Sequence, residues 1–90
     1  MLVTTSRYSS QATRNFAKNF AKIISCKYVA RGKKAIDSLV LLARKNGDDK
    51  ICVAIEKSSL LDHLEFLTIK PNLKWSWEID QVPVKHESEN

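Results

Sequence analysis

The sequence predicts one α/β domain, bordering on α+β, with helices packed on a mixed sheet in the order β-α-β-α-β-β-β. In the N-terminal half, short apolar and β-branched runs alternate with two segments whose apolar residues recur at helical spacing. Beyond residue 50 the pattern changes to strands separated by brief polar turns. Ninety residues support one hydrophobic core, and two Gly and two Pro leave little room for long loops. We therefore expect one domain made mostly of regular structure.

The N-terminal part is predicted to form a buried strand followed by an amphipathic helix. Residues 2–5 are apolar or β-branched, and Ser9 and Ser10 then offer N-caps to a helix over about 11–24. The expected apolar face of this helix comprises Phe16, Phe20, Ile23 and Ile24. A cationic stripe at i, i+4 and i+8 lies roughly on the opposite side and consists of Arg14, Lys18 and Lys22.

The middle of the chain is predicted to contain a second strand, a second helix and a central strand. Residues 27–30 form the expected strand, and Gly32 marks the turn into a helix from about 34 to 46, which Gly47 closes. The expected core face of this helix is Ile36, Leu39, Val40 and Ala43. Residues 51–55 form a continuous apolar run, which indicates a strand covered by helices on both faces.

The C-terminal part is predicted to contain two further strands and a tail. A polar connection of five to six residues leads to a strand at residues 63–69. After Pro71-Asn72, the alternation of residues 73–79 predicts a strand near an edge, with one face buried. Residues 80–90 have the composition of a flexible tail. The folded domain is therefore expected to span residues 1–79.

Charge is strongly segregated along the chain. The first 36 residues contain eight Lys or Arg and no Asp or Glu, whereas the remaining 54 contain seven basic and ten acidic side chains. The first 36 residues thus carry a net charge of +8 and the remaining residues a net charge of −3, which together give the net charge of +5. Solubility alone does not require such segregation, so we infer that the partner is a polyanion.

The predicted topology brings the basic loops together. If the first three strands are parallel, as right-handed crossovers imply, the loops after them emerge at one carboxyl edge of the sheet. Arg7 lies in the first loop, residues 31–34 in the second and Lys57 in the third. Both helices begin at that edge, and their unpaired N–H groups favour anions such as phosphate.

The candidate RNA-binding residues are the basic side chains of these elements together with one aromatic ring. Arginine ranks above lysine because its planar fork chelates phosphate oxygens. Tyr8 lies in the basic first loop, where its ring either stacks on a base or covers the edge of the first helix. We expect recognition of folded RNA through shape and phosphates. The candidate set is Arg7, Tyr8, Arg14, Lys18, Lys22, Arg31, Lys33 and Lys34.

No motif predicts catalysis, a cofactor or a metal site. His63 lacks a spaced nucleophile, no Gly-rich phosphate loop is present, and Cys26 and Cys52 form no CxxC pair. Both cysteines are expected to act as small hydrophobic residues. No run approaches the 18 apolar residues of a membrane span, and none resembles a signal peptide. We expect a non-enzymatic, cytoplasmic protein with no membrane partner.

Residues 2–16, LVTTSRYSSQATRNF, and the string YVARGKK at residues 28–34 resemble archaeal members of the Brix domain family of ribosome-biogenesis proteins. The likeness extends from residue 2 to about residue 79. It implies a fold similar to the anticodon-binding domain of class IIa aminoacyl-tRNA synthetases. It also implies a non-enzymatic role in ribosomal RNA processing and ribosome assembly, with ribosomal RNA or its precursor and assembly proteins as partners.

The resemblance covers only the first of the two similar halves of a Brix fold. We therefore expect either a shortened form or a weak homodimer in which a second copy replaces the missing half. The strand at residues 73–79 is the expected contact, because an edge strand is open to pairing. Light scattering at high micromolar concentration tests this expectation, since a strict monomer would contradict the homodimer.

Two other functions fit the same residues. The string at residues 30–33 and the order of elements also resemble Alba-like proteins, which implies a dimeric binder of DNA or RNA. The short connection at residues 56–62 and the Thr-Thr-Ser-Arg start argue against that reading. The third hypothesis is a protein–protein adaptor that has lost its RNA surface, which predicts that Arg14→Glu and Lys18→Glu leave function unchanged.

Overall fold

The computed structural model describes residues 1–70 and 76–84, which form a five-stranded sheet and two helices. In chain order the elements are β1 (Leu2–Thr5), α1 (Gln11–Ile23), β2 (Lys27–Tyr28), α2 (Ile36–Lys45), β3 (Lys50–Lys57), β4 (Leu60–Ile69) and β5 (Trp77–Pro83). The predicted fold class and order of elements are confirmed.

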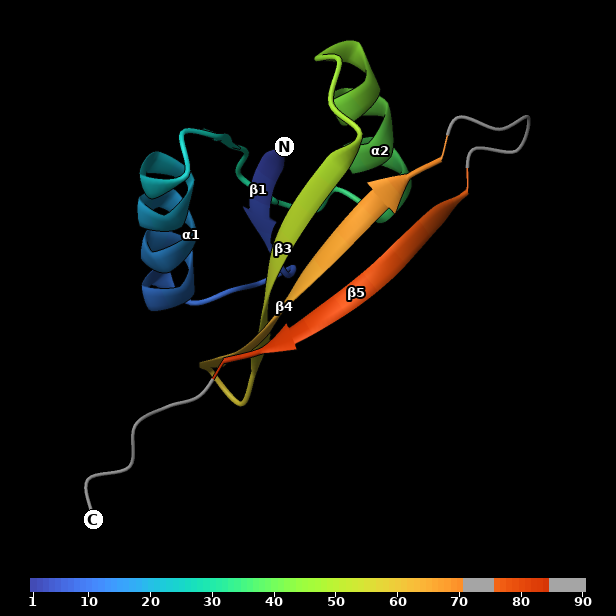
Figure 1. The fold of residues 1–90 in the computed structure, drawn as a ribbon. Helices are drawn as coiled ribbons and strands as arrows, with labels where there is room; N and C mark the ends of the chain where they lie inside the picture. Colours follow the sequence, from blue (N-terminus) through green and yellow to red (C-terminus); the bar gives the residue numbers. More distant parts are fainter. Residues whose placement is uncertain (71–75, 85–90) are drawn as a thin grey trace.

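The sheet is mixed, with the strand order β2-β1-β3-β4-β5. β1 pairs in parallel with β2 and β3, whereas β4 pairs antiparallel with β3 and β5. Figure 1 shows α1 and α2 on opposite faces of this sheet. Because β1 and β2 are parallel neighbours, the loops that follow them leave the sheet at the same edge, as the sequence predicts.

The core has two layers, one on each face of the sheet, because successive strand residues point to opposite faces. One layer joins α2 to the sheet through Leu2, Leu39, Val40, Ala43, Ile51, Val53, Leu67 and Ile69. The other joins α1 to the sheet through Val3, Ala17, Ala21, Cys52, Ala54 and Leu64. Burial raises the pKa of the Cys52 thiol to about 11, and this cysteine packs as a small hydrophobic residue, as predicted.

The face of α1 that packs on the sheet differs from the prediction. The buried residues of this helix are the small side chains of Thr13, Ala17 and Ala21. Phe16 and Phe20 stack beside this contact, with ring centroids 5.9 Å apart, and are only partly buried. The prediction that Ile23 belongs to the apolar face is wrong, because its side chain is 80% exposed. At about 100° per residue it lies roughly 120° from Ala17 around the helix axis.

The connection between β3 and β4 is much shorter than predicted. Ser58 and Ser59 alone turn the hairpin, with positive φ values of 51° and 65°. A register shift at residues 55–56 marks a β-bulge just before the turn. Two turn residues with positive φ match the right-handed twist of the flanking strands. The strands therefore stay hydrogen-bonded up to the turn, with Lys57 paired to Leu60. The predicted loop at residues 56–62 is therefore mostly strand.

The segment between β2 and α2 contains less regular structure than predicted. β2 has only two residues, although the Val29 N–H still donates to the Val3 carbonyl at 2.8 Å. The Lys34 N–H donates to the Arg31 carbonyl at 3.0 Å, so residues 31–34 form a turn and α2 begins two residues later than predicted, at Ile36. Gly32 allows this turn because its φ is +52°.

β5 forms one edge of the sheet and continues to Pro83, past its predicted end at residue 79. Residues 80–83 thus belong to the sheet, and their assignment to a tail is wrong. An exposed edge strand has a polar composition similar to that of a tail, and Pro is tolerated there. The predicted strand residues 73–75 and the tail residues 85–90 lie outside the described residues. Ile79 and Val82 are about half exposed on β5, and the homodimer through this edge stays a prediction.

Candidate nucleic-acid interface

Arg31 ties the loop after β2 to the end of β1. Its Nε donates to the Lys34 carbonyl at 2.6 Å and its Nη1 to the Thr5 carbonyl at 2.9 Å, and the residue is 9% exposed. Arg7 Nε lies 3.4 Å from the same Lys34 carbonyl. Burial, together with the nearby charge of Arg7, lowers the pKa of Arg31. Arg31 therefore holds two loops together, and its guanidinium is mostly hidden from solvent.

A groove of about 440 Å³ lies at the carboxyl ends of β1 and β2, and we call it the carboxyl-edge groove. Its lining residues come from the last residue of β1, from the two loops after these strands and from the first turn of α1. They are Thr5, Ser6, Tyr8, Ser9, Arg14, Ala30, Arg31, Gly32 and Lys33. Four of the eight candidate residues thus meet around one hollow, which agrees with the predicted convergence of the first two loops.

The third loop does not join this groove. The last residue of β1, Thr5, is paired with Ala54, whereas β3 continues to Lys57. At about 3.3 Å per residue, these three extra residues carry the hairpin turn roughly 10 Å beyond the end of β1. Lys57 instead lies 3.8 Å from Asp62 across the hairpin. The expectation that all three basic loops converge is therefore wrong for the third.

Tyr8 lines the groove in a turn that is fixed on both sides. Its φ of 56° is in the left-handed region, which costs a residue with a side chain roughly 1 kcal/mol. The hydroxyls of Thr5 and Ser9 lie 2.9 Å apart, and Arg14 Nη1 donates to the Ser9 carbonyl. The Tyr8 ring is 81% exposed, so it does not cover the apolar edge of α1.

The N-terminus of α1 is occupied by a carboxylate of the protein itself. Glu56 lies in β3 beside the register shift between β3 and β4, and it accepts hydrogen bonds from the Ser10 hydroxyl (2.5 Å) and the Thr13 hydroxyl (2.7 Å). The Ser10 N–H also donates to both carboxylate oxygens, at 3.0 and 3.2 Å. The Glu56 carboxylate therefore already occupies a place at this helix end where a phosphate was predicted to bind.

These hydrogen bonds predict a pH-dependent contribution of Glu56 to stability. The Ser10 hydroxyl, then the Thr13 hydroxyl and the Ser10 N–H, lower the pKa of Glu56 from its ordinary value of 4.5. A lowered pKa stabilises the fold fully above pH 4.5, and this contribution is lost as the pH falls through the folded-state pKa. We expect Glu56→Gln to be less stable than the wild type at pH 7, with a difference that shrinks below pH 4.5.

Urea unfolding at a series of pH values checks this prediction. Asp80→Asn is the control, because Asp80 is an exposed carboxylate on the edge strand β5. A Glu56→Gln variant whose deficit stays the same from pH 7 to below pH 4.5 would contradict the proposed role of the carboxylate.

The start of α2 has a different environment from that of α1. Ala35 occupies the N-cap position and makes no side-chain hydrogen bond to the helix, and Asp37 is the acidic residue of the first turn. Lys34 Nζ donates to the Ala30 carbonyl at 3.1 Å, and Lys33 is exposed beside the carboxyl-edge groove. Lys34 lines a separate depression on α2. The two lysines of the turn thus point to two different surfaces.

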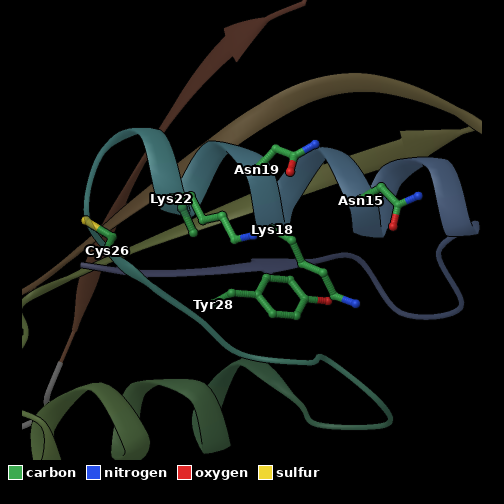
Figure 2. A pocket seen from close by; sticks show the side chains of 7 residues that line it. Asn15, Lys18, Asn19, Lys22, Cys26 and Tyr28 are labelled. Atoms are coloured by element: carbon green, nitrogen blue, oxygen red, sulfur yellow. The ribbon is translucent and has the colours of Figure 1, made fainter.

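A second groove, of about 380 Å³, lies between α1 and β2, and we call it the α1–β2 groove. Figure 2 shows Lys18 and Lys22 reaching from α1 toward Tyr28, with Asn15 and Asn19 along the helix. Lys18 Nζ is 5.7 Å from the centroid of the Tyr28 ring, a cation–π contact. Two further candidate residues therefore line a hollow next to the first.

The cationic stripe of α1 flanks the buried face and does not oppose it. Arg14, Lys18 and Lys22 each follow a buried residue of the helix by one position, so at about 100° per residue they point sideways, toward β2. Arg14 lines the carboxyl-edge groove and the two lysines line the α1–β2 groove. The stripe thus links the two grooves.

Three polar residues of the α1–β2 groove lie outside the candidate set predicted from the sequence, namely Asn15, Asn19 and Tyr28. The two asparagines each follow a residue of the cationic stripe, Arg14 and Lys18, and they are four residues apart. This spacing places both amides on the same side of the helix beside the stripe, and it could have predicted them from the sequence. The contact of Tyr28 with Lys18 could not be predicted from local sequence, because it depends on the pairing of β2 with β1.

The candidate cations form no close ion pair with a carboxylate in the part of the chain that the structure describes, although the charge of Arg14 helps to lower the pKa of Glu56. The ion pairs found there include Met1–Asp48, Lys57–Asp62, His63–Asp62, His63–Glu65 and Lys70–Glu78. None of these pairs includes a Lys or Arg from residues 7–34. A cation without an internal partner keeps its full attraction for an external anion.

Residues 1–70 and 76–84 offer little support for other kinds of site. No group of three His, Cys, Asp or Glu side chains there is arranged to hold a metal ion. No helix in this part of the chain is long and apolar enough to span a membrane. The basic surface around the two grooves is therefore the strongest candidate site among the described residues.

Comparison with known proteins relates part of this chain to ribosome-biogenesis proteins. No family model matches the chain. A probable Brix domain-containing ribosomal biogenesis protein of Methanothermobacter thermautotrophicus is 41% identical over 44 residues, which are 49% of this chain and 28% of the relative. The crystal structure of Mil, an archaeal Imp4-like protein, matches 76% of the chain with a TM-score of 0.69 and 32% identity. The chain resembles archaeal Brix domain proteins.

A second solved structure supports the Brix resemblance. A probable ribosomal biogenesis protein from Aeropyrum pernix K1 matches 74% of the chain with a TM-score of 0.71 and 29% identity. The chain spans less than half of the length of each Brix-like relative, namely 28%, 43% and 38%. The mixed sheet with a helix on each face is thus shared with part of Imp4-like Brix proteins.

Proposed function

We propose that the protein binds ribosomal RNA or its precursor and acts, without catalysis, in ribosomal RNA processing and ribosome assembly. The observation that carries the proposal is the surface around the two grooves, where the candidate cations form no close ion pair with a carboxylate among the described residues. The relatives' names supply the context, since they describe ribosome biogenesis.

The geometry favours a polyanion that touches several points at once. The carboxyl-edge groove and the α1–β2 groove share α1 as a wall, and Arg14, Lys18 and Lys22 lie along that wall. Folded RNA presents phosphates and 2′-hydroxyls over a surface of this kind, and the asparagine amides next to the lysines both donate and accept hydrogen bonds. Recognition through phosphates and shape is therefore the proposed mode.

Fluorescence anisotropy tests the proposal with a folded ribosomal RNA fragment, a DNA duplex and a single-stranded RNA, each titrated across salt. We expect tighter binding to the folded RNA than to the other two. In the triple variant Arg7→Ala, Arg14→Ala, Lys33→Ala, affinity should fall, and the salt slope should become shallower by about one for each phosphate contact removed. Arg31 is left intact because its side chain is buried.

A matched control separates specific contacts from net charge. The triple variant Lys50→Ala, Lys57→Ala, Lys70→Ala removes the same charge from exposed positions outside both grooves. Equal losses in the two triple variants would contradict the assigned surface. Absence of binding to any nucleic acid at low salt would contradict RNA binding itself, and equal binding to the DNA duplex would favour an Alba-like function.

A further inference from the structure

We propose that the carboxyl-edge groove accepts one unstacked nucleotide of the bound RNA, with its base on the Tyr8 ring and its phosphate against Arg14 and Lys33. The inference rests on the proposed RNA binding and adds the kind of nucleotide that is recognised. It follows from the exposure of Tyr8, the anchoring of its turn and the composition of the groove.

Tyr8 has the properties of a stacking platform. Its ring is 81% exposed and belongs to neither core layer, so packing of the protein does not explain an aromatic residue there. Its left-handed φ of 56° suits Gly or Asn better than Tyr. A large exposed ring at a backbone position that disfavours it indicates a role outside the fold, and bases stack readily on such rings.

The turn that carries Tyr8 is anchored on both of its sides. Before it, Arg7 Nε reaches the Lys34 carbonyl at 3.4 Å. After it, the Ser9 hydroxyl lies 2.9 Å from the Thr5 hydroxyl, and the Ser9 carbonyl accepts from Arg14. Anchoring on both sides lowers the entropy that a base would cost when it orders the loop, so the platform is largely preorganised.

The groove beside Tyr8 combines small lining residues with two cations. Ala30 and Gly32 lie on the opposite loop from Tyr8, and the volume of about 440 Å³ is within the range of small-molecule pockets. Arg14 is held in place by its hydrogen bonds to the Ser9 carbonyl and to the Gln11 amide oxygen (2.9 Å). A guanidinium has five N–H donors, so an oriented Arg14 keeps donors for a phosphate, and Lys33 adds a second charge.

The proposal predicts which RNA the groove selects. In a continuous duplex both faces of every internal base are covered by the stack, so no base face is offered to Tyr8. Bulged and loop nucleotides are unstacked and offer a face, as in most sequence-specific RNA recognition. We therefore expect a hairpin RNA with one bulged nucleotide to bind roughly tenfold more tightly than the same hairpin without the bulge, which corresponds to one stacked base.

The experiment uses a hairpin RNA with a single bulged 2-aminopurine, whose fluorescence is quenched when it stacks, and the same hairpin fully paired. Tyr8→Asn removes the ring and suits the left-handed backbone, so this variant should fold at least as well as the wild type. Tyr8→Phe keeps the ring. Ile23→Asn is the matched control, because it removes another exposed apolar side chain, at 80% exposure, from a position outside both grooves.

The wild type, Tyr8→Phe and Ile23→Asn should quench the bulged 2-aminopurine and prefer the bulged hairpin, and Tyr8→Asn should lose both properties. If RNA binds but the two hairpins bind equally, or if Tyr8→Asn keeps the preference, the nucleotide site is wrong while the proposed function stands. If neither hairpin nor any other folded RNA binds, the proposed function fails and the nucleotide site fails with it.

Discussion

Arg31→Ala is expected to destabilise the protein by about 2–4 kcal/mol, because it removes two charge-assisted hydrogen bonds from a mostly buried position. The side chain donates to the Thr5 and Lys34 carbonyls at 2.9 and 2.6 Å and is 9% exposed. Without the guanidinium, the loop after β2 loses its hydrogen bond to the end of β1. Against the 5–15 kcal/mol of a typical domain, such a loss is large. Urea unfolding at pH 7 measures it.

Two further variants show whether the effect comes from the forked hydrogen bonds or from charge. Arg31→Lys keeps the charge but has a single nitrogen, which does not reproduce the two-point contact, so it should also be clearly destabilised. Lys33→Ala removes a nearby exposed cation and should stay within about 0.5 kcal/mol of the wild type. An Arg31→Ala variant as stable as Lys33→Ala would show that the link is dispensable.

Arg31 also shows where the sequence analysis of the site reached its limit. Its place in a basic string made it a candidate RNA contact of the same kind as Arg7 and Arg14. Its role as a link depends on the Thr5 carbonyl, which is 26 residues away in the sequence and is brought near by the parallel pairing of β1 with β2. Local charge patterns do not contain that information, so sequence alone ranks a buried arginine beside exposed ones.

The fold was more predictable than the site because its signals are local. The core face of α2, at Leu39, Val40 and Ala43, follows directly from helical spacing. The continuous apolar run of β3 correctly indicates cover by helices on both faces. The errors arose where tertiary contacts outweigh local pattern. Small residues pack α1 on the sheet, and pairing with β4 holds the polar residues 80–83 in a strand.

The sequence correctly predicts that the cations of α1 lie in a row along the helix. It does not predict which part of the molecule that row faces. Arg14, Lys18 and Lys22 do lie in a row, yet they face β2, where Tyr28 and two asparagines complete the α1–β2 groove. The occupied N-terminus of α1 was similarly hidden, because Glu56 reaches Ser10 across 46 residues of sequence. Both features arise from the way the sheet brings distant segments together.

Reversing the charge of Lys18 and Lys22 is expected to have the largest effect on RNA binding. We expect Lys18→Glu, Lys22→Glu to weaken binding of the folded RNA about 100-fold at low salt, since two attractive contacts become repulsive. The loss should shrink as salt is added, because screening weakens attraction and repulsion alike. Anisotropy titrations at several salt concentrations measure both effects, and circular dichroism verifies that the variant is folded.

The control for this reversal is Lys50→Glu, Lys57→Glu, which changes the net charge equally at exposed positions outside both grooves. If only the long-range electrostatic field attracts the RNA, the two double variants should bind it with similar affinity. If the RNA contacts the α1–β2 groove, Lys18→Glu, Lys22→Glu should bind it far more weakly than the control. If Lys18→Glu, Lys22→Glu bound RNA with the affinity of the wild type, α1 would not be part of the RNA interface. If this variant also kept its ability to support ribosome assembly, the protein–protein adaptor would become the better account of the basic surface, because an adaptor does not need its cations to meet phosphate.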